Sequence, residues 1–116
     1  MNAPAPAAKP RVIVIDDEPG FRELLSYELE ARGYDVATAE NGDRGLDLAR
    51  ERPADLVLCD LTMPGRGGLD TLRALKQLDD TMEVVITTGH ASLEAAVDAM
   101  RQGAYDFITK PFRLED

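Results

Sequence analysis

The chain has few of the features of a secreted or membrane-bound protein. It contains a single cysteine in 116 residues, so an internal disulfide is excluded. No apolar run approaches the ~20 residues of a membrane span, and the N-terminal MNAPAPAAKP lacks the continuous apolar core of a secretory signal. We therefore expect a soluble, cytoplasmic protein without membrane contact, in which Cys59 packs as a small apolar side chain.

Basic residues are also scarce. The chain has 13 Lys and Arg against 22 Asp and Glu, a net charge of −9. Direct binding of nucleic acid or of an anionic membrane by this segment is disfavoured, because either would need a basic face. Its ligands should be cations, or proteins with basic patches.

What the chain does have is a regular alternation of short apolar runs and amphipathic segments. Residues 1–10 hold three Pro and four Ala and are predicted to be a disordered leader, so the folded domain is 11–116. Apolar runs rich in branched side chains predict strands at 12–15, 34–38, 56–59, 84–87 and 106–109.

The intervening segments have helical spacing. Gly33 and Gly103 suit the C-terminal ends of the first and fourth predicted helices, and Ser92 suits the start of the fourth. The helical pattern of the second, at 43–52, is weaker because it contains Gly45. Asn41-Gly42 is read as a loop rather than a hairpin turn. The apolar faces are predicted from Phe21, Leu24, Leu25 and Leu29 in the first helix, from Leu69, Leu72, Leu75 and Leu78 in the third, and from Leu93, Ala96, Val97 and Met100 in the fourth.

Strand alternating with helix predicts an α/β fold, a doubly wound five-stranded parallel sheet covered by helices on both faces. The order 2-1-3-4-5, that of a flavodoxin-like fold, would make the first and third strands neighbours. Only PFRLED follows the fifth predicted strand, so a fifth helix is expected to be largely missing.

Polar residues follow four of the five predicted strands. They are Asp16 and Asp17, Asp60, Thr88 and Lys110. The carboxyl ends of parallel strands form one rim, where ligands bind. Two carboxylates ~4 Å apart repel by about 4 kcal/mol at an effective dielectric of 20, so a cation is expected beside the three acids. Mg²⁺ suits an all-oxygen site, and Lys110 and Thr88 could hold phosphoryl oxygens.

Each of these residues also has an ordinary structural interpretation. Asp16 and Asp17 could cap the first helix, Asp60 could be a turn residue, Thr88 a loop hydroxyl and Lys110 a surface cation. Their joint placement at one rim favours a functional site.

Four segments, RVIVIDDE, LVLCDLTMPGRGG, VVITTGH and YDFITKPF, resemble the signature blocks of the receiver domain of bacterial two-component response regulators. The resemblance runs from Arg11 to Phe112. ASLEAAVDAMRQGAYDFITKPF is most similar to receivers of enhancer-binding transcription activators.

The resemblance implies a role for each residue of the rim. Asp60 would be the phosphoacceptor and Asp17 a direct ligand of Mg²⁺ or Mn²⁺, whereas Asp16 would act mostly through water. The backbone carbonyl of Thr62 would complete the protein's share of the metal ligands.

Further residues would act at the phosphoryl group. Lys110 would contact it, Thr88 would be the switch hydroxyl and Phe107 the switch aromatic. The resemblance also implies a cis peptide bond before Pro111, and a role for His90 and Thr62 in limiting dephosphorylation by water.

The implied partners are a sensor histidine kinase or phosphotransfer protein, an output domain C-terminal in the parent protein, and a second copy paired through the fourth helix and fifth strand. The chain would be a signalling domain that catalyses only its own phosphorylation and slow dephosphorylation. Two alternatives are a stand-alone Mg²⁺ phosphatase with an aspartyl-phosphate intermediate and a pseudo-receiver that only binds partners. Thr62 stands where such phosphatases commonly carry a second acid, and pseudo-receivers tend to lose the acids or the lysine.

Overall fold

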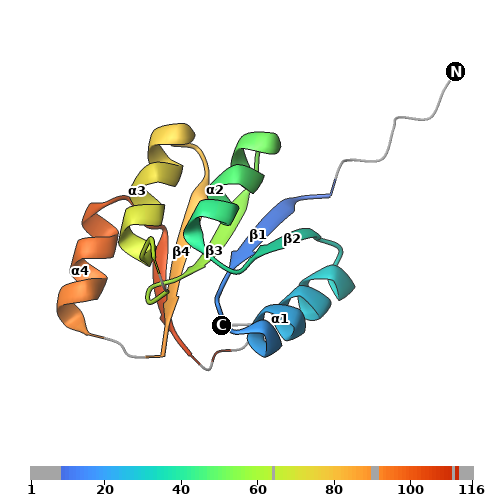
Figure 1. The fold of residues 1–116 in the computed structure, drawn as a ribbon, viewed down its shortest axis with the longest axis horizontal. Coiled ribbons are helices and arrows are strands. Elements are labelled where there is room, and N and C mark those ends of the chain that lie inside the picture. The colour runs from blue at the N-terminus through green and yellow to red at the C-terminus, as the bar shows by residue number, and fades with distance from the viewer. Residues whose placement is uncertain (1–8, 64, 90–91, 111, 113–116) are drawn as a thin grey trace, which may run out of the picture.

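The computed structural model describes residues 9–63, 65–89, 92–110 and 112. Strands and helices alternate along the chain, as the sequence predicts (Figure 1). The elements are β1 (Arg11–Ile15), α1 (Pro19–Ala31), β2 (Asp35–Ala39), α2 (Gly42–Glu51), β3 (Leu56–Asp60), α3 (Gly68–Leu78), β4 (Glu83–Thr88), α4 (Leu93–Arg101) and β5 (Asp106–Thr109).

The sheet confirms the predicted topology. Its order is β2-β1-β3-β4-β5 and every pairing is parallel. β3 and β4 run one residue further at their carboxyl ends than predicted, to Asp60 and Thr88. Both residues are therefore fixed by ladder pairing, Asp60 opposite Thr87 and Thr88 opposite Thr109.

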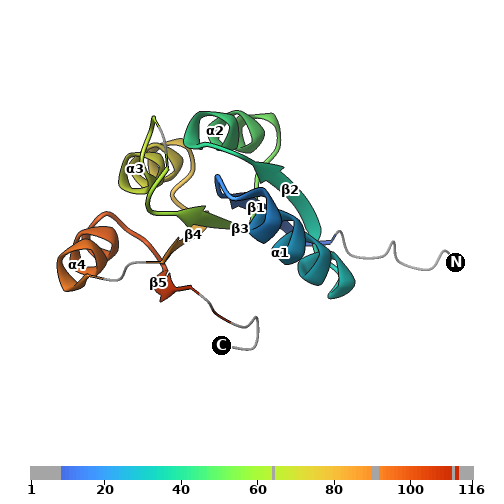
Figure 2. The ribbon, with the colours of Figure 1, turned by 60° about the horizontal axis from the view of Figure 1, so that its bottom comes forward.

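Helices pack on both faces of the sheet (Figure 2). On one face α2, α3 and α4 enclose a core of alternate strand residues such as Ile13, Ile15, Val57 and Ile86, together with Cys59, which is buried as predicted. On the other face α1 contributes Leu25 and Leu29 to a smaller core. Side chains alternate between faces along each strand, which explains why VIVI and LVLC are apolar throughout.

The predicted apolar faces of the helices are only partly buried. Leu25, Leu29, Leu72 and Leu75 are in the core, but Leu24 is 58 % and Leu78 43 % exposed, so their expected core role is wrong. The difference is largest in α4, where Leu93 is 82 % exposed and Val97 and Met100 are also exposed. This helix packs on β5 and α3 at the sheet edge and buries only Ala99, since no element lies outside it among the described residues.

Local signals explain the helix boundaries. Asn41 is the N-cap of α2, and its side chain accepts a hydrogen bond of 2.8 Å from the Arg44 amide, so Asn41-Gly42 is no hairpin turn. At Gly45 in α2, a Cβ would lie 2.2 Å from Cδ1 of Ile15, so the glycine lets α2 approach β1 closely. Gly33 and Gly103 follow their helices with φ of 93° and 98°, as expected of C-terminal glycines.

The α1 face of the sheet is open toward β5. An apolar groove there is lined by Leu56, Leu58, Val85, Ile108 and Phe112, among others. The predicted disordered leader, residues 1–10, lies outside the described residues apart from Lys9 and Pro10, and the prediction of a largely missing fifth helix concerns residues 111–116, of which only Phe112 is described. Within the described part of the chain, no helix combines the length and apolar character needed to cross a membrane.

Candidate functional site

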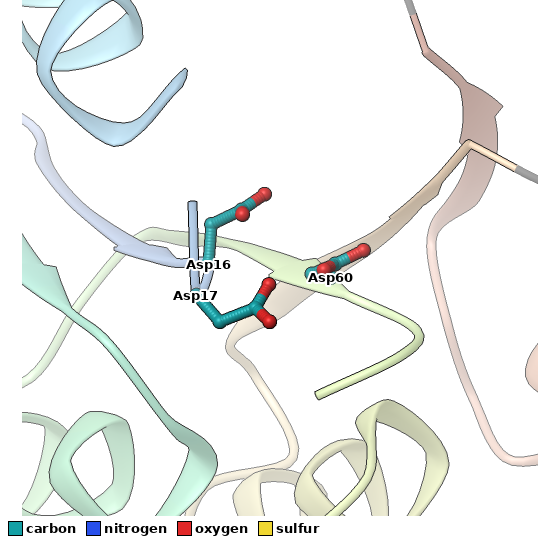
Figure 3. A group of neighbouring side chains, drawn as sticks. All are labelled: Asp16, Asp17 and Asp60. Carbon is teal, nitrogen blue, oxygen red and sulfur yellow. The ribbon is translucent and has the colours of Figure 1, made fainter. Parts of the chain in front are cut away.

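The carboxylates of Asp16, Asp17 and Asp60 meet at the carboxyl ends of β1 and β3 (Figure 3). Ile15 pairs with Cys59, so the residues that follow on the two neighbouring strands stand side by side. One ligand oxygen from each carboxylate lies within 4.8 Å of the other two. Asp16 is 1 % and Asp60 5 % exposed, whereas Asp17 is exposed to solvent.

Lys110 reaches this cluster from the residue after β5. Its Nζ lies 2.7 Å from Asp16 Oδ2, 3.6 Å from Asp60 Oδ1 and 3.9 Å from Glu18 Oε1. The other oxygen of Asp16 accepts a 2.9 Å hydrogen bond from the Glu18 amide. The N-cap of α1 is Glu18, so helix capping by Asp16 or Asp17 does not explain the cluster.

Burial, neighbouring charges and hydrogen bonds shift the pKa values of Asp60 and Lys110. Burial, assisted by the charges of Asp16 and Asp17 and a hydrogen bond with Asp17, raises the pKa of Asp60 from 3.8 to about 6, although Lys110 opposes the change. Burial disfavours the ammonium of Lys110, but its hydrogen bond to Asp16 and the charges of Asp16, Asp60 and Glu18 outweigh that cost and raise its pKa. The site thus holds excess negative charge that one lysine does not neutralise.

Thr88 and Phe107 lie on β4 and β5. Thr88 is buried as the last residue of β4, and its carbonyl accepts a 2.7 Å hydrogen bond from the Lys110 amide. The half-buried Phe107 packs against the larger core. Thr62 is exposed in the loop after Asp60. The predictions for His90 and for the bond before Pro111 fall outside the described residues.

The loop after Asp60 is held close to the sheet. The Leu61 amide donates to the Thr87 carbonyl at 2.8 Å, and the Gly68 amide donates to the Leu61 carbonyl at 2.9 Å. Gly68 lies so close that a Cβ would stand 2.5 Å from the Asp60 carbonyl oxygen and 2.6 Å from the Leu61 Cα. Arg66 adds a 2.8 Å ion pair with Asp43 at the start of α2.

Sequence reasoning missed two neighbours of Lys110. Glu18 lies beside its ammonium, and the ring of Phe21 lies under it, with Nζ 4.4 Å from the ring centroid. The helical spacing of Phe21 indicated only a core role. No local pattern could have placed its ring beside Lys110, because the two residues meet through the order of the strands.

The donor set fits a hard divalent cation. Carboxylate oxygens are the ligands that Mg²⁺ prefers, and it is commonly held by one or two of them with several waters. The described residues offer three carboxylates at suitable separations and no histidine or thiolate in the cluster. The cluster can therefore hold a metal ion with Lys110 as a second positive charge.

Residues 12–116 match the family model of the response regulator receiver domain. The DNA-binding transcriptional regulator NtrC of Escherichia coli is 38 % identical over 105 residues, 90 % of this chain and 22 % of that protein. The uncharacterized transcriptional regulatory protein YkoG of Bacillus subtilis is 38 % identical over 108 residues, which cover 93 % of this chain and 47 % of YkoG. The chain thus spans less than half the length of these relatives.

A solved structure is similar over most of the chain. It is a response regulator protein from Burkholderia pseudomallei with a phosphorylated aspartic acid, a calcium ion and citrate. The TM-score is 0.88 at 34 % identity, covering 92 % of this chain and 63 % of that one. The similarity to NtrC agrees with the predicted resemblance to receivers of enhancer-binding activators. Fold, acidic rim and matched sequence together show that this chain belongs to the receiver domain family of two-component response regulators.

Proposed function

We propose that the chain, from about residue 11 onward, is a phosphoacceptor receiver that takes a phosphoryl group onto Asp60. The observation that carries this proposal is the placement of Asp60 at a strand end, within ligand distance of Asp16 and Asp17 and 3.6 Å from Lys110. The phosphorylated aspartic acid of the Burkholderia protein supports it. Of the carboxylates in this cluster, Asp60 alone is both buried and the last residue of an assigned strand.

Asp17 and Asp60 would hold Mg²⁺ or Mn²⁺ directly, together with the backbone carbonyl of Thr62, and Asp16 would act through water. When bound, the ion would neutralise charge on the phosphoryl oxygens. The close packing of Gly68 against Asp60 and Leu61 fixes the backbone that leads to Thr62.

The transfer is a nucleophilic substitution at phosphorus. A carboxylate oxygen of Asp60 attacks the phosphorus of a phosphohistidine, forming an O–P bond while the N–P bond breaks. The imidazole nitrogen keeps the electron pair of that bond and takes up a proton. Lys110 donates to a phosphoryl oxygen, and water later hydrolyses the acyl phosphate, returning the Asp60 carboxylate and inorganic phosphate.

The new charge on Asp60 would act on its neighbours in the sheet. The Thr88 hydroxyl would move toward the phosphoryl group and Phe107 would repack, changing the surface of α4 and β5. Thr88 lies on the strand next to β3, and Phe107 lies on the strand beyond it.

The partners would be a sensor histidine kinase or phosphotransfer protein, and an output domain C-terminal in the parent protein. A second copy would pair through α4 and β5, where Leu93, Val97, Met100 and Tyr105 are exposed. The domain would act as a switch that turns over only its own phosphoryl group. The phosphatase alternative lacks its second acid at Thr62, and a pseudo-receiver would not need the complete set of acids and lysine.

Incubation with acetyl phosphate and Mg²⁺ tests the proposal. Intact-mass analysis should show one added phosphoryl group that chelator prevents and that Asp60→Asn abolishes. Asp98→Asn, which removes an exposed acid of α4, should label like the wild type. Absence of labelling, or labelling that persists in Asp60→Asn, would contradict the assignment, and turnover of many external phosphoesters would favour a phosphatase.

A further inference from the structure

The Lys110 ammonium contacts both acids and an aromatic ring. The acids are Asp16, Asp60 and Glu18, and the ring is that of Phe21 near the start of α1. We propose that Phe21 is a positioning residue that holds the Lys110 ammonium beside Asp60. The inference rests on the proposed phosphoryl transfer, and it adds a residue that the rim of strand ends does not contain.

The ring is fixed in its orientation. Phe112 packs against it edge to face, with ring centroids 5.8 Å apart and planes at 73°. Both rings lie against the core between α1 and the sheet, where Leu25 and Leu29 are buried. Lys110 and Phe112 come from the same segment after β5, so this segment contacts Phe21 twice, once through a cation and once through a ring.

A ring suits this place better than another acid. Lys110 has three N–H donors, and Asp16 accepts one of them at 2.7 Å. The face of an aromatic ring attracts the ammonium without adding charge to a site that already has Asp16, Asp17 and Asp60.

Glu18 is the reason a positioning residue is needed. Its carboxylate lies 3.9 Å from Lys110 Nζ and its side chain is 68 % exposed, so it is free to follow the ammonium toward solvent. The ring of Phe21, which packs with Phe112 against the core, gives the ammonium a further contact that does not follow Glu18 toward solvent. Without it the ammonium could follow Glu18 toward solvent, away from the phosphoryl group.

Two ringless variants, Phe21→Leu and Phe21→Met, should label with acetyl phosphate about three- to tenfold more slowly at saturating Mg²⁺, the size expected of a partly buried cation–π contact. The Mg²⁺ concentration for half-maximal labelling should not change. Phe21→Tyr, which keeps the ring, should restore the rate. Tyr34→Leu is the matched control, because it removes a ring from the same core at the amino end of β2, away from the rim.

The second readout is independent of phosphorylation. In the unphosphorylated, metal-free wild type, the protons on Lys110 Cε should be shifted upfield in the NMR spectrum by the ring of Phe21. The shift should persist in Phe21→Tyr and Tyr34→Leu and disappear in both ringless variants.

Several outcomes would overturn the proposal. The proposal fails if Phe21→Leu and Phe21→Met leave both the NMR shift of Lys110 and the labelling rate unchanged. It also fails if Tyr34→Leu or Phe21→Tyr lowers the labelling rate as much as the ringless variants do. If the wild type takes up no phosphoryl group, the proposed function fails, and the NMR shift alone then decides whether Phe21 holds Lys110.

Discussion

Asp60 is the residue where fold stability and function conflict. Its carboxylate is buried beside two others, and the pKa of about 6 means that the native state favours the protonated form at a pH where the unfolded chain, near 3.8, is ionised. Between these two pKa values the native state binds more protons, so this group destabilises the fold as the pH rises through that range.

Asp60→Asn should therefore stabilise the metal-free protein. Removing the charge should add about 1–3 kcal/mol to the free energy of unfolding near neutral pH, with the gain shrinking by more than half as the pH is lowered to about 4.5. Urea unfolding followed by circular dichroism at both pH values measures this. Asp98→Asn serves as the control, and a gain that is independent of pH would contradict the assigned cause.

At the scale of elements, β3 and α3 pack closely where Gly68 meets the backbone of Asp60 and Leu61. Gly67 and Gly68 are adjacent, yet a Cβ at Gly67 would meet only the Leu61 carbonyl at 3.9 Å, whereas one at Gly68 would overlap the backbone of Asp60 and Leu61. Backbone cannot move aside as a flexible side chain can. Of these two glycines, only Gly68 is therefore required by packing.

Gly68→Ala should lower the free energy of unfolding by about 1–3 kcal/mol, as overpacking does. It should also slow phosphorylation of Asp60, because the loop that carries Thr62 would shift. Gly67→Ala should stay within about 0.5 kcal/mol of the wild type. Thermal unfolding and acetyl phosphate labelling measure the two effects; equal behaviour of the two variants would refute the close-packing account.

The whole molecule carries a net charge of −9, and part of that charge is gathered at one rim. A cation that binds only the native state stabilises it by mass action. A cation held by the acidic cluster would thus stabilise the entire domain, because the carboxylates lie at the ends of β1 and β3, neighbouring strands inside the sheet.

Mg²⁺ should raise the melting temperature of the protein. At ten to a hundred times its Kd it should add about 1.4–2.7 kcal/mol to the free energy of unfolding. NaCl at matched ionic strength should give a much smaller rise, since it only screens charge. Asp17→Asn should abolish the specific gain, which differential scanning fluorimetry can measure. A gain of equal size with NaCl, or one retained in Asp17→Asn, would place the ion elsewhere.

Much of this protein follows from local pattern. The alternation of apolar runs and helical spacing predicted every strand and helix described, and the placement of acids after the first and third strands predicted the rim. The reason is that a strand buried on both faces needs only a short run of consecutive apolar residues, as in VIVIDD and LVLCD, and such a run is visible in the sequence.

Only the tertiary structure decided which helical faces are buried and what surrounds Lys110. Leu93 and Leu24 carry the same apolar signal as Leu25, yet they face solvent, because α4 lies at the sheet edge and α1 has no helix beside it among the described elements. Lys110 meets Asp16, 94 residues away, and the ring of Phe21 through strand order and helix packing. Contacts between distant segments depend on how whole elements pack, and no spacing within a segment encodes them.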